Sequence, residues 1–341
     1  MPPLADSTSH ADTRQSGAYR PRALVADIGG TNMRFALSDL DELTISNYAL
    51  FKNDLFASPF EALSAYLKTT PERPDHVGFA IAGSVEGDSV TPTNKRWTLT
   101  AEEVRRATGA KDVCFINDFE AIALSLPTLP REDRVQIGGA VSRNTAPMAV
   151  LGPGTGLGVA GLVRGPDRDI ALAGEGGHVG FAARTAEDFE IVQALQADLD
   201  FVSAEQLISG PGLVALYQLL CERHGLTTPS VTPEDVVKAV DENGDVHARH
   251  ALTLFARWLG SFAGDVALTF GARGGVFIGG GIAPRILSVL KDGPFRQAFE
   301  DKGRLSRYLE AIPIHVITTP NAGLKGAALA VSDRAARPSR G

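Results

Sequence analysis

The chain has 341 residues, of which 44% are hydrophobic and 21% charged, so it can bury a large core and its length suggests about two domains. Its net charge of -7 argues against a nucleic-acid-binding protein, which usually carries a basic patch. No apolar run approaches the roughly 18 residues that a membrane span needs, and two cysteines are too few for a disulfide framework or a cysteine-rich zinc site.

The two ends of the chain differ from its middle. Residues 1–21 are polar and lack the apolar stretch of a signal peptide, so we expect a disordered tail there. We expect a second tail at 334–341. The sequence therefore predicts a cytoplasmic protein.

The first folded segment is predicted to contain three antiparallel strands, at 23–26, 33–38 and 44–52. The turn between the first two is rich in glycine, which lets a ligand approach the backbone closely. Backbone N–H groups and a threonine hydroxyl in such a turn are suited to phosphate oxygens, and an acidic residue at its mouth is suited to Mg²⁺ held through water. An ordinary Gly-Gly hairpin remains the alternative. The motif is Asp27-Ile28-Gly29-Gly30-Thr31-Asn32.

A helix at 60–68, a strand at 77–82 and a helix that ends at Gly109 follow in the predicted order. The next strand, at 113–116, ends at Asn117-Asp118, before a helix at 119–126. Folds of the α/β class place active-site groups at such strand ends. Asp118 is therefore a candidate general base for phosphoryl transfer to a hydroxyl. A helix N-cap explains the same pair of residues equally well.

A second glycine-rich hairpin is predicted between strands at 148–151 and 157–163, with the turn Gly152-Pro153-Gly154-Thr155-Gly156. Two such turns facing each other would hold a polyphosphate from both sides, and their similarity indicates an internal duplication. Neither turn is a P-loop, because the chain contains no Gly-Lys dipeptide. The pattern Gly156-x-Gly158-x-x-Gly161 lies inside a predicted strand, so we reject a dinucleotide-binding motif.

Side chains suited to a polyol occur at three further places. Glu175 and His178 flank two glycines, and together they can accept from and donate to sugar hydroxyls. Asn94 follows a strand and a turn, and Glu205, which alone resembles an ordinary helix residue, stands before a Gly-Pro-Gly sequence. A zinc site is disfavoured, because His178 has no cysteine or histidine at ligand spacing.

The second half of the chain is predicted to be more helical. The apolar spacing indicates helices at 188–199, 211–224 and 246–270, and Thr232-Pro233-Glu234-Asp235 is typical of a helix start. A strand at 275–278 runs into Gly279-Gly280-Gly281. The last predicted elements are a strand at 314–318 and a helix at 323–331.

Six motifs taken together resemble those of the bacterial ATP-dependent glucokinases, which belong to the hexokinase–actin ATPase superfamily. The resemblance runs from about 24 to 329, and the motifs stand in the family's order. They are Asp-Ile-Gly-Gly-Thr-Asn from Asp27, Ile-Asn-Asp-Phe from Ile116, Gly-Pro-Gly-Thr-Gly-Leu-Gly from Gly152, Glu-Gly-Gly-His-Val from Glu175, Ser-Ala-Glu-Gln-Leu-Ile-Ser-Gly-Pro-Gly-Leu from Ser203, and Gly-Val-Phe-Ile-Gly-Gly-Gly-Ile-Ala-Pro-Arg from Gly275.

The resemblance implies an α/β fold of the two-domain actin-like ATPase (ribonuclease H-like) kind, with the active site in an interdomain cleft. The small domain is expected at 22–128 plus 319–333 and the large domain at 129–318. The implied reaction transfers the γ-phosphoryl group of MgATP to the 6-hydroxyl of glucose, with closure of the cleft excluding water. Glucose and ATP are the expected ligands, no nucleic acid or membrane partner is expected, and a homodimer is expected.

The resemblance also assigns roles to individual residues. Asp118 is implied as the catalytic base, and Asp27 as the group near Mg²⁺. The glucose shell is implied to be Asn94, Asn117, Asp118, Glu175, His178 and Glu205. The nucleotide contacts are implied to be Ala26, Asp27, Ile28, Gly29, Gly30, Thr31 and Asn32 in the first loop, Gly152, Gly154, Thr155 and Gly156 in the second, and Gly280 and Gly281 at the adenosine.

Two departures from the family pattern and three alternative interpretations accompany this resemblance. The chain has Gly180 where relatives carry Asp, and Lys95-Arg96 adds positive charge beside Asn94. A kinase for another hexose, such as mannose or an amino sugar, and a catalytically weak sugar-sensing regulator remain open. The zinc-bearing sister family of sugar kinases and repressors is disfavoured, because Cys114 and Cys221 cannot form its cysteine cluster.

Overall fold

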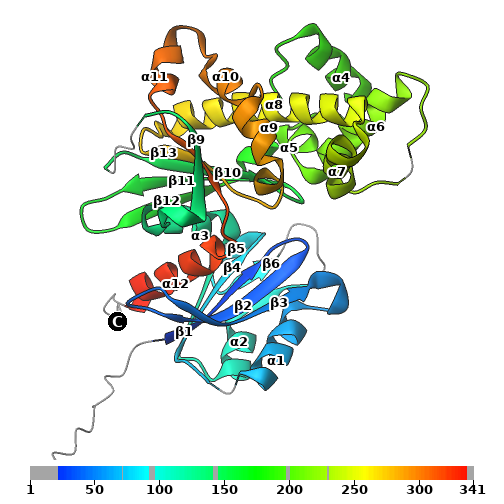
Figure 1. Ribbon diagram of the computed structural model, residues 1–341. Coiled ribbons are helices and arrows are strands. Elements are labelled where there is room, and N and C mark those ends of the chain that lie inside the picture. The colour runs from blue at the N-terminus through cyan, green and yellow to red at the C-terminus, as the bar shows by residue number, and fades with distance from the viewer. Residues whose placement is uncertain are drawn as a thin grey trace, which may run out of the picture.

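The computed structural model describes residues 22–70, 72–91, 97–140, 145–196, 200–228 and 230–335. Two large sheets lie one above the other, and two helices separate them (Figure 1). The first sheet has the order β3-β2-β1-β4-β8 and the second the order β12-β11-β10-β13-β14-β9. In the first sheet β1, β2 and β3 form an antiparallel meander, and β1 pairs on its other side with the parallel strand β4. In the second sheet β10, β11 and β12 form the same meander, and β10 pairs on its other side with the parallel strand β13. This repeated order agrees with the duplication expected from the two hairpins.

The strands of the first sheet are β1 (Arg22–Ile28), β2 (Asn32–Asp39), β3 (Ile45–Lys52), β4 (His76–Ile81) and β8 (Asp112–Asn117). Those of the second sheet are β9 (Arg134–Gly138), β10 (Met148–Pro153), β11 (Leu157–Arg164), β12 (Asp169–Gly174), β13 (Gly275–Ile278) and β14 (Ile314–Ile317). A small sheet is formed by β5 (Ser84–Glu86), β6 (Ser89–Thr91) and β7 (Leu99–Thr100).

The first sheet is covered by helices on both faces, because side chains alternate along each strand. Leu24, Ala26 and Ile28 of β1 pack into a core with α1 (Pro59–Thr69) and α2 (Ala101–Thr108). Ala23 and Val25 face the opposite core, which contains α12 (Ala322–Ala335) and the start of α3 (Asp118–Ser125). Helix α2 ends at Gly109 as predicted, with that glycine in the left-handed conformation, and a capping box of Thr100 and Glu103 starts it.

The second sheet is also buried on two faces. One face packs on the other side of α3, and the remaining large-half helices cover the outer face (Figure 1). These helices are α4 (Ala186–Gln196), α5 (Ala204–Leu207), α6 (Gly210–Glu222), α7 (Pro233–Asn243), α8 (Val246–Phe270), α9 (Leu287–Asp292), α10 (Phe295–Glu300) and α11 (Ser306–Glu310). Short 3₁₀ turns are η1 (Asn53–Leu55), η2 (Leu126–Thr128), η3 (Arg131–Asp133), η4 (Gly176–His178), η5 (Ala283–Ile286) and η6 (Gly303–Leu305).

The structure shifts several predicted boundaries. Helix α4 begins at Ala186, two residues before the predicted start, because Thr185 and Asp188 exchange hydrogen bonds at its first turn. Helix α12 continues to Ala335 and so passes the expected end of the folded chain, with the Arg334 Nε atom 3.4 Å from Asp112 Oδ1. Strands β5, β6, β7, β9 and β12 were not predicted, because they are short or partly exposed.

Within the described part of the chain, no helix combines the length and the apolar character needed to cross a membrane. Both cysteines are free and buried, as their apolar surroundings indicated. The expected tails fall almost entirely on residues outside the described ones.

His315 gives the second sheet a predicted sensitivity to acid. It lies buried in β14, stacked on Phe277 at 5.0 Å, and its Nδ1 atom has no hydrogen-bond partner within the described residues. Burial, and then the Arg134 guanidinium, lowers the pKa of His315 from 6.5 to about 4. The unfolded chain therefore takes up a proton between these values before the folded chain does, so stability is lost as the pH falls from 6.5 towards 4.

We expect His315→Phe to remove this loss. The wild-type free energy of unfolding should fall by roughly 2 kcal/mol more than that of the variant between pH 7.5 and pH 5. Urea titrations of both proteins at the two pH values measure the difference. An equal fall in both proteins would mean that His315 does not titrate in this way.

Candidate active site

The two glycine-rich loops meet across the gap between the sheets. The Thr31 Oγ1 and Thr155 Oγ1 atoms are 3.2 Å apart, and a Cβ atom on Gly30 would lie 3.0 Å from Thr155 Oγ1. Each loop joins the first two strands of its own meander, β1 to β2 and β10 to β11. The two loops therefore face each other, which is the arrangement that would hold a polyphosphate from both sides.

Backbone donors collect where the two loops meet. The N–H groups of Gly30, Thr31, Thr155 and Gly156 have no acceptor among the described residues. The carbonyl groups of the first loop are occupied, because Asn53 Nδ2 donates to the oxygens of Gly29 at 2.8 Å and Gly30 at 2.9 Å. Unpaired N–H groups on two facing loops form the kind of concave donor site that binds anions.

A third glycine segment closes on the second loop. A Cβ atom on Gly152 would lie 2.6 Å from the Gly279 carbonyl carbon, so the two backbones touch there. Gly280 has a φ of 79°, a conformation that side chains rarely adopt. A Cβ atom on Gly281 would meet nothing within 4 Å, so open space borders the backbone at this point.

Asp118 stands at the carboxyl end of β8, as the first residue of α3. The preceding residue, Asn117, is the N-cap of that helix, and its Oδ1 atom accepts from the N–H groups of Phe119 at 2.9 Å and Glu120 at 3.2 Å. The capping interpretation is therefore correct for Asn117, whose amide NH₂ group carries the remaining donors. The Asp118 side chain accepts from the same Phe119 N–H through its Oδ1 atom at 2.9 Å, and it stands at the strand end, which is where the sequence predicts a base.

The pKa of Asp118 is raised from 3.8 to about 7, first by burial and then by the negative charge of Asp27. The carboxylate of Glu175 raises it further, so three acidic groups share this region. A carboxylate with a pKa near 7 is suited to proton transfer, because it is both available and basic at neutral pH.

Gly158 contacts the residue that follows Asp118, and this contact was not predicted from the sequence. A Cβ atom on Gly158 would collide with the ring of Phe119, so the ring lies directly on the β11 backbone. The aromatic ring thereby fixes the first turn of α3, which carries Asp118. The only sequence signal is an extra glycine inside a predicted strand, which marks a close approach of another group.

Asp27 is held by groups that the predictions omitted. Its Oδ2 atom lies 3.1 Å from Arg34 Nη1, and a Cβ atom on Gly323, at the start of α12, would lie 2.9 Å from its carboxylate carbon. Burial raises the pKa of Asp27, while the Arg34 charge opposes the rise. The signal for Arg34 was present, because a tight hairpin pairs Asp27 with Arg34 in register.

Three of the predicted sugar residues come together around the second loop. The His178 Nε2 and Glu205 Oε1 atoms are 4.0 Å apart, and Glu205 Oε2 accepts from the N–H of Leu157 at 2.7 Å. Glu175 and His178 flank the short turn η4, and both are exposed. Gly156 has no room for a side chain, because a Cβ atom there would collide with Glu205. Asn94 lies outside the described residues.

The site residues described above can bind a sugar and a nucleotide, but their acidic and histidine side chains do not form a metal centre of several protein ligands. Among the described residues, no three His, Cys, Asp or Glu side chains lie close enough together to hold a metal ion. The buried Asn32 Oδ1 atom has no hydrogen-bond partner in the described chain, which leaves one further polar group at the first loop for a ligand.

Comparisons with known proteins give the family of the chain and its structural relatives. A family model described as Glucokinase matches residues 24–334. A glucokinase of Psychromonas ingrahamii is 42% identical over 306 residues, which cover 89% of this chain and 95% of the relative. A crystal structure of glucokinase from an Antarctic psychrotroph has a TM-score of 0.80 at 36% identity, covering 92% of this chain and 99% of that one. Glucokinase from Balamuthia mandrillaris, solved in complex with glucose, shares the fold, with a TM-score of 0.78 at 22% identity over 93% and 95% of the two chains.

Proposed function

The chain belongs to the glucokinase family, with the α/β actin-like fold of its solved members, and we infer that it transfers the γ-phosphoryl group of ATP to the 6-hydroxyl of glucose. The observation that carries this inference is Asp118, a partly buried carboxylate with a pKa of about 7 at the end of β8. In this role Asp118 accepts the hydroxyl proton as the sugar oxygen attacks phosphorus, and glucose 6-phosphate and ADP leave.

The sugar would be held by the group around η4. Glu175 and Glu205 accept hydrogen bonds from hydroxyl groups, and His178 donates or accepts according to its tautomer. Asn117 adds amide donors from the start of α3. Asn94 remains a predicted contact. The Glu205 carboxylate also binds the Leu157 backbone, so it connects the sugar group with the second loop.

The triphosphate would lie between the two glycine loops. Gly30, Thr31, Thr155 and Gly156 offer four N–H groups there that have no acceptor in the described part of the chain, a number that suits several phosphate oxygens. The adenosine is assigned to the open backbone at Gly280 and Gly281, beside the second loop.

Asp27 fits the expected role beside Mg²⁺. It supplies one partly buried carboxylate, and Mg²⁺ bound with a nucleotide usually takes one or two carboxylates and completes its shell with phosphates and water. When bound, the ion would neutralise charge on the transferred phosphoryl group. Arg34 and the start of α12 hold the carboxylate in place.

The domain division stays a prediction, and we propose it in its original form, 22–128 plus 319–333 and 129–318. It is supported by α12, which packs on β1, β4 and β8 of the first sheet although it follows the whole second half of the chain. The site residues come from both parts, so closure of one part on the other would exclude water from the reaction. A cytoplasmic homodimer likewise stays a prediction.

A sugar panel tests the proposed function. We expect coupled ADP formation from MgATP with glucose, and less than about one-tenth of that kcat/KM with mannose or glucosamine, since loss or displacement of one hydrogen-bonded hydroxyl leaves a polar group of the closed site without its partner. The Asp118→Asn variant serves as the matched inactive control. Higher kcat/KM for another hexose would identify a different hexokinase. Saturable sugar binding without turnover would instead identify a sugar-sensing regulator.

A further inference from the structure

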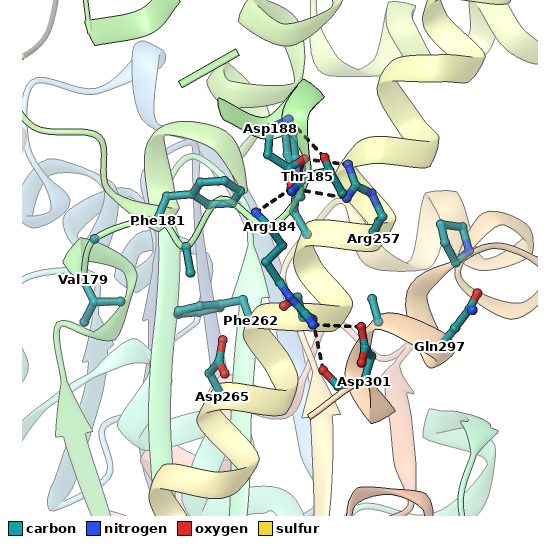
Figure 2. A pocket seen from close by; sticks show the side chains of 16 residues that line it. Val179, Phe181, Arg184, Thr185, Asp188, Arg257, Phe262, Asp265, Gln297 and Asp301 are labelled. Carbon is teal, nitrogen blue, oxygen red and sulfur yellow. Dashed lines mark hydrogen bonds and ion pairs between the residues drawn. The ribbon is translucent and has the colours of Figure 1, made fainter. Parts of the chain in front are cut away.

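A cavity of about 500 Å³ opens in the large half of the molecule, apart from the residues assigned to glucose and ATP. The segment that follows His178 forms one wall, α8 forms the floor, and the end of α10 forms the other wall (Figure 2). A cavity of this size accepts a small organic molecule, particularly when aromatic walls surround a few polar groups.

The apolar part of the cavity is aromatic. Phe181 and Trp258 are in edge-to-face contact, with their ring centroids 5.3 Å apart, and Phe262 lies beside them. Phe181 and Phe262 are only partly buried. Such rings favour a flat apolar group in the cavity, which can stack or pack edge-on against them.

Two of the three ion pairs at the cavity include a largely buried side chain and hold neighbouring segments of the fold together. Asp188 is buried and accepts from Arg257 Nη2 at 2.6 Å and from Trp258 Nε1 at 2.8 Å. Lys302 Nζ lies 2.6 Å from Asp265 Oδ1, and its side chain is only 10% exposed. Separating Arg257 from Asp188 would leave a buried carboxylate unpaired, and separating Lys302 from the half-exposed Asp265 would leave a largely buried ammonium group unpaired, and both are costly.

The third pair is different, because it bridges the cavity at the surface. Arg184 donates to the Asp301 carboxylate at 2.8 Å and to its backbone oxygen at 3.0 Å, and Figure 2 shows its side chain reaching towards that residue. The two side chains are 40% and 62% exposed. An exposed pair contributes little stability, so a ligand anion can replace Asp301 as the partner of Arg184.

The wall of the cavity continues directly into the sugar residues. Val179 follows His178, and the Val179 carbonyl accepts from Ala204 N at 2.9 Å, next to Glu205. Phe181 N donates to the Val202 carbonyl at 3.0 Å, and Gly180 forms a bridge with Ser203. The backbone that carries Phe181 is therefore paired, residue by residue, with the segment that leads to Glu205, and it is continuous in sequence with His178.

We propose that this cavity is an effector site for a flat apolar molecule that carries one anionic group, with the ring against Phe181 and Phe262 and the anion on Arg184. Occupancy alters the apparent affinity for glucose through the 179–181 and 202–204 segments. The coupling part of the proposal rests on the proposed sugar site, whereas the binding part does not.

The probe is 4-fluorobenzoate, followed by ¹⁹F NMR with glucose and ADP at saturation so that the proposed active site is filled. We expect saturable binding to the wild type. Arg184→Met retains the backbone N–H at position 184, which donates to Asp188 Oδ2. This variant should bind the probe about tenfold more weakly, because it loses a charge-assisted contact to the anion. Phe262→Ala should also weaken binding. Asp301→Asn should tighten it about threefold, because Arg184 loses a competing anion.

Two results would overturn the proposal. Equal affinity of the wild type and Arg184→Met, with unchanged melting temperature, would show that the anion does not lie on Arg184. Binding without any change in the glucose KM, measured with and without the probe, would show that the cavity is not an effector site. Loss of turnover in the absence of probe would instead count against the proposed kinase function, so the two failures are distinguishable.

Discussion

Asp118→Asn is expected to lose phosphoryl transfer by a factor of about 10²–10⁴, the usual cost of removing a general base. The amide keeps the shape of the side chain and can still accept the Phe119 N–H that Asp118 Oδ1 accepts at 2.9 Å. Glucose binding should therefore persist. Steady-state kinetics together with glucose titration by calorimetry measure both quantities. A variant within about threefold of the wild-type kcat would be incompatible with a base at this position.

The pH dependence of the wild type provides a second measurement on the same carboxylate. Because the pKa of Asp118 is about 7, the basic form is the minority species below that pH. We expect kcat/KM for glucose to fall about tenfold per pH unit below 7 and to level above it. The residual activity of Asp118→Asn should lack this dependence.

The thermal stability of Asp118→Asn provides a control, because we expect the substitution to raise stability while it lowers activity. The folded-state pKa of Asp118 is raised above its ordinary value of 3.8, so the folded chain holds its proton more tightly than the unfolded chain does. This penalises the folded state increasingly as the pH rises from 3.8 to 7. Asp118→Asn should consequently melt at a higher temperature than the wild type at pH 8, and the advantage should disappear near pH 4. Lower stability of the variant at pH 8 would indicate a structural role.

The parts of the site that lie on hairpins could be predicted from the sequence. Apolar runs on both sides of Gly29-Gly30 and of Gly152 to Gly156 indicate strand, turn and strand, and short turns leave few possible registers. The pairing of Asp27 with Arg34 follows from that register. The motif occurs twice in the sequence, but the facing of the two loops follows only from how the two sheets pack.

Contacts between distant segments could not be predicted in the same way. The ring of Phe119 lies on Gly158 because α3 crosses β11 closely, and Asp27 meets Gly323 because the last helix returns to the first sheet. Neither contact leaves a periodic signal, since each depends on how whole elements pack. The cavity beside Arg184 was missed for this reason: its walls come from three separate parts of the chain.

Gly154→Val is expected to raise the KM for ATP by at least about tenfold while changing the KM for glucose less than about twofold. A Cβ atom on Gly154 would meet nothing within 4 Å, so the side chain has room in the free protein. The Gly154 N–H bond to the Gly156 carbonyl and the bond from the Gly210 N–H survive, because valine retains both backbone groups. The branched side chain would instead fill the space in front of the second loop, where the phosphates are proposed to lie.

A matched substitution in the same loop separates steric blocking of ATP from damage to the fold. A Cβ atom on Gly152 would lie 2.6 Å from the Gly279 carbonyl carbon and 2.8 Å from the Gly280 nitrogen, so Gly152→Ala must displace backbone. We expect that variant to melt at a clearly lower temperature and to lose both ligands. Gly154→Val should melt within about 2 °C of the wild type, since no contact of the free protein is broken. If Gly154→Val also lost glucose or stability, the space beside Gly154 would belong to the fold, and the nucleotide would have to bind elsewhere.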